Sequence, residues 1–99
     1  MAKGVRKTPG RLAEKLREVR LALGLSQTEL LKRLGVEDLI TYHRISDYEL
    51  GKNEPQLLVL LEYARLANVW VDVLIDDRLD LPAKLPAAKR HEGVRRRRS

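Results

Sequence analysis

The sequence predicts an all-α fold, a compact bundle of four to five short helices with flexible basic arms at both ends. Three observations support this prediction. Apolar residues recur every three or four positions over most of the chain, which is the period of an amphipathic helix. Residues that start and stop helices lie between these apolar stretches. The chain of 99 residues contains no cysteine, so packing rather than disulfides must stabilise its small core.

The first two helices are expected over residues 11–23 and 27–34. Four apolar residues lie on one face of the first helix, at spacings of 4, 3 and 4: Leu12, Leu16, Val19 and Leu23. The second helix begins with a capping box, in which Ser26 and Glu29 each satisfy the free backbone N–H of the other. Gly35 is a typical terminator for this helix.

A third helix is expected over residues 41–50, with Thr41 as its N-cap and Gly51 as its stop. Ile45 and Tyr48 lie three positions apart and should face inward. The opposite side of this helix is polar and carries hydrogen-bond donors. The third helix therefore has one side for the core and one side for a ligand.

A fourth helix, the most apolar one, should begin at Pro55 and continue to about Ala67. Four of its residues are available to the core: Leu57, Leu58, Leu61 and Ala64. The segment that follows, Val69–Ile75, alternates in the manner of a strand. It forms either a short fifth helix or a strand that pairs with the same segment of a second subunit.

The excess of positive charge lies in the two ends of the chain. The net charge of +6 combines +3 in residues 1–10, −3 in residues 11–82 and +6 in residues 83–99. Basic arms of this kind bind phosphate without reading sequence, and a solubilising tail is the alternative for Arg95–Arg98. The expected domains are a flexible basic arm over 1–10, a folded domain over 11–78 and a Pro-containing, mostly disordered basic tail over 79–99.

Little in the composition favours an enzyme, and no catalytic residue, metal or cofactor is expected. The chain has two histidines, His43 and His91, no glycine-rich phosphate loop and no pair spaced like metal ligands. A cluster of acidic residues is more typical of helix ends than of a cation site: Asp72, Asp76, Asp77 and Asp80. The longest apolar run, Leu57–Leu61, is far shorter than the ~20 residues of a membrane helix, so a cytoplasmic protein is expected.

The second and third expected helices have a further significance. Two short helices joined by a turn fit the ~12 Å width of the DNA major groove when the second exposes polar side chains. A plain helical bundle would show the same periodicity, so the shape alone does not decide. Further motifs are Leu16-Arg17-Glu18 with Arg20, Gly24 to Leu31, Ile45 to Gly51, and Pro55 with Leu60. Over about residues 11–76 this set resembles the helix-turn-helix family of phage repressors and Cro proteins (XRE-like).

The resemblance implies a sequence-specific regulator of transcription, a repressor or antitoxin-like protein that binds double-stranded DNA. The positions that match the family's base-reading residues are Tyr42, His43, Arg44 and Asp47. Phosphate contacts are expected from Gln27, Thr41, Ser46, Lys52 and Asn53. The resemblance also implies a structural pair between Arg20 and Glu49, which locks the first helix to the third.

Each base-reading candidate has two chemical uses. Arg44 can donate two hydrogen bonds to guanine or hold a phosphate, and His43 can donate to a base or a phosphate. Asp47 only accepts hydrogen bonds when ionised, so it either reads a cytosine amine or positions Arg44. Tyr42 can contact a phosphate through its hydroxyl, contact a thymine methyl through its ring, or pack against the turn.

One departure from the family pattern concerns the turn before the third helix. Between Gly35 and Ile45 the chain has about four more residues than the compact family pattern. Either the turn is longer, or the helix begins near Asp38. The second arrangement would bring Leu39 or Ile40 toward the DNA.

Two other functions are compatible with the same fold. One is a protein-binding adaptor, and the other is a nonspecific nucleic-acid-binding protein. RNA binding is less favoured, because three tyrosines and one tryptophan offer few stacking platforms. A homodimer is suggested by the small core and the apolar segment 69–75, and a regulatory partner protein is compatible with the absence of an effector domain.

Overall fold

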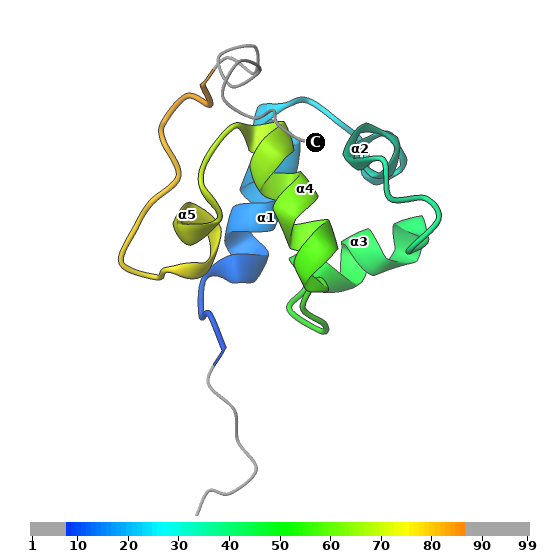
Figure 1. Cartoon of the computed structure of the whole chain (residues 1–99), viewed down its shortest axis with the longest axis horizontal. Helices are drawn as coiled ribbons and strands as arrows, with labels where there is room; N and C mark the ends of the chain where they lie inside the picture. Colours follow the sequence, from blue (N-terminus) through cyan, green and yellow to red (C-terminus); the bar gives the residue numbers. More distant parts are fainter. Residues whose placement is uncertain (1–7, 87–99) are drawn as a thin grey trace, which may run out of the picture.

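Five α-helices make up the part of the chain that the structure, a computed structural model, describes (Figure 1). Within the described residues 8–86 the helices are α1 (Leu12–Ala22), α2 (Gln27–Leu34), α3 (Tyr42–Glu49), α4 (Leu57–Ala67) and α5 (Val71–Ile75). The predicted all-α fold is confirmed, and the first three helices begin and end within one residue of the predicted positions. Most of the two basic arms, residues 1–7 and 87–99, lies outside the described residues.

The start and end of α2 follow from local sequence. The Ser26 hydroxyl accepts from the Glu29 backbone N–H at 3.0 Å, and the Glu29 carboxylate accepts from the Ser26 N–H at 2.8 Å. These contacts hold the pKa of Glu29 below its usual value, because they favour the ionised carboxylate. Gly35 ends the helix in the left-handed region, at φ 70°. The capping box therefore sets where α2 presents its N-terminus.

The extra residues after Gly35 lengthen the turn and do not extend α3. The backbone N–H groups of Leu39 and Ile40 both donate to the Val36 carbonyl, at 2.8 and 3.1 Å, so the chain makes a closed turn before α3. Val36 is buried and Ile40 is half-buried, which anchors this turn on the core. Thr41 occupies the predicted N-cap position, but its side chain makes no capping hydrogen bond.

Our prediction of the buried face of α4 was partly wrong. Leu57 and Leu58 are 81% and 62% exposed, whereas the buried residues are Val59, Leu60, Tyr63, Ala64 and Ala67. The helix also begins two residues later than predicted, after Gln56 as N-cap. Because α4 is apolar on almost every side, periodicity could not select its inner face.

The segment after α4 forms a short helix, which decides between the two alternatives for residues 69–75. Asn68 ends α4 in the left-handed conformation, and α5 then buries Leu74 between α1 and α4. Leu81 and Leu85, both within the predicted basic tail over 79–99, also pack against the core. None of the helices within residues 8–86 is long and apolar enough to cross a membrane.

Candidate nucleic-acid interface

The outer face of α3 carries the side chains that we predicted to read DNA. Ile45 and Tyr48 are buried on the inner face, as expected, and α3 packs on both α1 and α2. Tyr42, His43 and Arg44 are exposed in the first turn, and the predicted phosphate contact Thr41 is exposed directly before it. Ser46 and Asp47 are half-buried. The N-terminal turn is therefore the most exposed part of α3.

Two aromatic rings are stacked at the start of α3. The ring centroids of Tyr42 and His43 lie 4.2 Å apart, with 29° between their planes. This contact restrains two neighbouring rotamers and presents the rings as a unit. In the part of the chain that the structure describes, the neighbouring guanidinium of Arg44 forms no ion pair. Arg44 is thus an exposed donor beside two aromatic edges.

At the other end of α3, Asp47 contacts the loop that follows the helix. The Asn53 amide donates to the Asp47 carboxylate at 3.3 Å, and the Lys52 backbone N–H donates to the Asp47 carbonyl at 2.9 Å. Gly51, at φ 77°, turns the chain between them. In the structure the Asp47 carboxylate therefore accepts from Asn53, and we had not predicted this contact. It brings two candidate DNA contacts together.

The N-terminus of α2 is joined to α1 and α3 through three side chains. The Arg20 guanidinium donates to both carboxylate oxygens of Glu49, at 2.7 and 2.9 Å, and to the Leu25 carbonyl at 3.0 Å. Gln27 donates to the same carboxylate at 3.3 Å. We call Arg20, Glu49 and Gln27 the Arg20–Glu49 cluster. The hydrogen bonds to Glu49 raise the pKa of Arg20 above its usual value, so the guanidinium stays charged.

The link between Gln27 and Glu49 was absent from the predictions. The sequence offers no signal for it, because the two residues are 22 positions apart and meet only through the crossing of α2 and α3. Behind the cluster, the buried hydroxyl of Tyr63 on α4 has no hydrogen-bond partner. Burial, and then the negative charge of Glu49, raise the pKa of this phenol well above its usual value. Tyr63 therefore remains neutral.

The region of α2 and α3 has a small excess of negative charge. Residues 27–54 contain four basic residues, Lys32, Arg33, Arg44 and Lys52, and six acidic ones, Glu29, Glu37, Asp38, Asp47, Glu49 and Glu54. A face of this kind attracts DNA only weakly over long distances. This face can instead orient the protein on DNA and form hydrogen bonds with it.

Residues 8–86 show no metal centre, and two small hollows lie beside Tyr48. No group of three or more histidines and carboxylates there could hold a metal ion. Two hollows flank Tyr48, with volumes of about 210 and 230 Å³. Both are smaller than the ~300 Å³ at which pockets for drug-sized ligands begin.

Comparison with known proteins supports a DNA-binding domain. A family model described as helix-turn-helix matches residues 16–74, which is more than half of the chain and extends from α1 into α5. No curated protein matches the sequence significantly.

Proposed function

The chain belongs to the Cro/repressor-like helix-turn-helix family of DNA-binding regulators, and we propose that it is a sequence-specific repressor or antitoxin-like regulator. In this proposal α3 enters the major groove. The observation that supports it best is the exposed N-terminal turn of α3, a helix that packs on α2 and whose last residue, Glu49, accepts from Gln27 at the capped N-terminus of α2. Recognition helices of this family read base edges with such residues.

The base-reading role falls mainly to the exposed turn of α3. Arg44 is exposed and unpaired within residues 8–86, so its fork of N–H groups is available for guanine. Tyr42 and His43 would contact bases or phosphates as a stacked pair. Asp47 already accepts a hydrogen bond from Asn53, and its second oxygen is the one that would accept from a cytosine amine.

The phosphate contacts would come from the two ends of the motif. Gln27 begins α2, where free backbone N–H groups and the helix dipole favour an anion. Lys52 and Asn53 follow α3, while Thr41 and Ser46 flank its first turn. Such contacts set the register of the protein on the duplex without reading its sequence. The basic arms would add nonspecific attraction.

We also propose that the protein acts as a homodimer. Around α5, Trp70 is 71% exposed and Ile75 is 42% exposed, which leaves apolar area that a second copy could cover. Two subunits related by a two-fold axis would place their α3 helices ~34 Å apart, one turn of DNA. The preferred site would then be a palindrome.

Selection from a random duplex library tests these proposals together. We expect a palindromic preferred sequence, and we expect Arg44→Ala to lose ~1–3 kcal/mol on it while relaxing the preference at one base pair. Lys52→Ala is the matched control, since it should weaken binding to all sequences alike and reduce the salt slope by ~0.9. An unchanged preference in Arg44→Ala would remove that residue from base reading. An adaptor would give no preferred duplex and little salt dependence.

A further inference from the structure

The side chain of Tyr63 on α4 is buried together with its polar end. Its exposed fraction is 0%, and within residues 8–86 the hydroxyl group has no hydrogen-bond partner. A buried polar group without a partner destabilises a fold, and a phenylalanine ring would fill nearly the same space without that cost. The packing of the free protein therefore does not explain a tyrosine at this position.

Charged and polar groups of α1 and α3 lie close to the Tyr63 hydroxyl. Burial raises the pKa of this phenol, and so do Glu49 and Tyr48, whereas the positive charge of Arg20 lowers it. Among these groups the Glu49 carboxylate is the strongest acceptor, because hydrogen bonds to an ionised partner are stronger than those between neutral groups. Glu49 is therefore the acceptor that suits the Tyr63 hydroxyl best.

The hydrogen bonds that Glu49 accepts in the structure differ in length. Arg20 donates to its two oxygens at 2.7 and 2.9 Å, whereas Gln27 donates at 3.3 Å. The last distance lies beyond the usual ~2.7–3.2 Å of an N–H···O bond. The Glu49 side chain is only 4% exposed, so solvent does not readily replace a donor that leaves. Gln27 is thus the donor most easily withdrawn from this carboxylate.

Gln27 has a second anionic partner in the proposed function. It is half-buried at the first position of α2, where we propose that it contacts a DNA phosphate. A movement toward the phosphate lengthens a bond to Glu49 that is already long. The phosphate also brings a second negative charge toward the carboxylate, which is unfavourable. Glu49 therefore needs another donor in the DNA complex more than in the free protein.

We propose that the Tyr63 hydroxyl is a reserve donor, which donates to Glu49 when Gln27 turns to a DNA phosphate. The inference rests on the proposed function. Tyr63 touches no DNA in this arrangement and is a positioning residue. The missing hydrogen bond weakens the free state, so forming it in the complex favours the bound state by the difference. Tyr63 thereby links phosphate binding by α2 to the ion pair between α1 and α3.

Tyr63→Phe in the full chain tests this exchange of donors, because it removes the hydroxyl and keeps the ring. On the duplex recovered by selection we expect ~5- to 10-fold weaker binding, about the effect of one hydrogen bond. Urea denaturation without DNA should show no loss of stability, because the hydroxyl has no partner in the free protein. Leu60→Val is the matched control on the buried face of α4, and it should lower stability without changing the affinity.

A second comparison uses the chain that carries Gln27→Ala and needs no DNA. Without the Gln27 amide, the Glu49 carboxylate lacks one hydrogen bond in the free protein, so the Tyr63 hydroxyl should already donate to it. Tyr63→Phe should then lower the midpoint of urea denaturation, although it does not do so in the natural chain. It should cause no further loss of affinity there, because the hydroxyl keeps the same partner with and without DNA.

The outcomes distinguish this inference from the proposed function. Equal effects of Tyr63→Phe in the chains with and without Gln27 would overturn it. A loss of stability in the natural chain with unchanged affinity would do so as well, since the hydroxyl would then have a constant structural partner. Both results leave a sequence-specific regulator intact. Failure to recover any preferred duplex would instead reject the proposed function, and the urea comparison would still decide whether Tyr63 replaces Gln27 at Glu49.

Discussion

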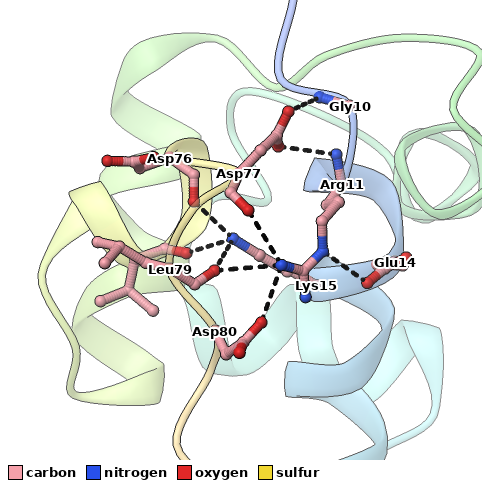
Figure 2. Close-up of polar contacts among 9 residues, drawn as sticks. Gly10, Arg11, Glu14, Lys15, Asp76, Asp77, Leu79 and Asp80 are labelled. Atoms are coloured by element: carbon pink, nitrogen blue, oxygen red, sulfur yellow. Dashed lines mark hydrogen bonds and ion pairs between the residues drawn. The ribbon is translucent and has the colours of Figure 1, made fainter.

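The two ends of α1 carry two polar networks that differ in their partners. Near the last turn, Arg20 binds a side chain, the carboxylate of Glu49 on α3. At the first turn, Lys15 donates only to main-chain carbonyls, those of Val73 within α5 and of Asp76 and Leu79 after it (Figure 2). The Arg20–Glu49 cluster lies directly behind the two helices proposed to touch DNA. The network around Lys15 and Asp77 lies outside these two helices.

This difference determines which properties of the protein should change when each network is mutated. Removing one member of a buried ion pair leaves an uncompensated charge, which costs far more than the intact pair contributes. Removing Lys15 leaves carbonyl dipoles without donors, which is a smaller cost. Because Glu49 also holds Gln27, the first network should couple stability to DNA binding. The second should affect stability alone.

The largest expected effect is that of Arg20→Met. The variant keeps the apolar stem but leaves the Glu49 carboxylate, whose side chain is only 4% exposed, without its cation. We expect a loss of ~3 kcal/mol in the free energy of unfolding, measured by urea denaturation. Arg17→Met is the matched control on the exposed side of α1 and should change stability by less than ~0.5 kcal/mol. A loss below ~1 kcal/mol would show that the pair is dispensable.

Lys15→Met should have an intermediate effect. Three carbonyls lose their charged donor, and we expect a loss of ~2 kcal/mol in the free energy of unfolding. The sequence preference for DNA should not change. Lys32→Met, at an exposed helical position, is the control. If Lys15→Met proved more damaging than Arg20→Met, the ranking of the two networks would be reversed.

The smallest expected effect is the acid sensitivity of the hydrogen bonds that the Asp77 carboxylate accepts from the backbone of Gly10 and Arg11. The N–H groups of Gly10 and Arg11 hold the pKa of Asp77 below the value of ~3.9 that an unfolded chain would have. A depressed pKa in the folded state means that the carboxylate stabilises the fold fully above that unfolded value. This contribution is lost as the pH falls through the lower, folded value.

Urea denaturation at several pH values measures this contribution. The stability difference between the natural chain and Asp77→Asn should be constant at neutral pH and should shrink as the pH falls below ~4. Asp72→Asn, which removes the same charge from an exposed residue of α5, serves as the control for the change in net charge. A difference that stays constant down to pH 2 would mean that Asp77 acts through its shape alone.

Much of the fold was predictable because its signals are local. The capping box and Gly35 delimit α2, and the spacing of Leu12, Leu16 and Val19 identifies the buried face of α1. The same reasoning placed Ile45 and Tyr48 inward, and therefore exposed Tyr42, His43 and Arg44. It failed in part on α4, where apolar residues on almost every side leave only a narrow polar face to mark the solvent.

The contacts of the candidate site were less predictable. The pair of Arg20 and Glu49 was expected only through family resemblance, and the contacts of Gln27 with Glu49 and of Asp47 with Asn53 were not expected at all. Each depends on how two elements cross or on how a loop returns. Periodicity carries no information about either.

By itself the sequence determined α1 to α3, the capping box of α2 and the polar face of α3, because those features arise from interactions within about one helical turn. Only the tertiary structure decided which side of α4 is buried, that the long turn closes on Val36 and that residues 69–75 form a helix. It also placed Asp77 against Gly10, 67 positions away. Such contacts depend on the packing of whole helices around a shared core, and short stretches of sequence do not encode that geometry.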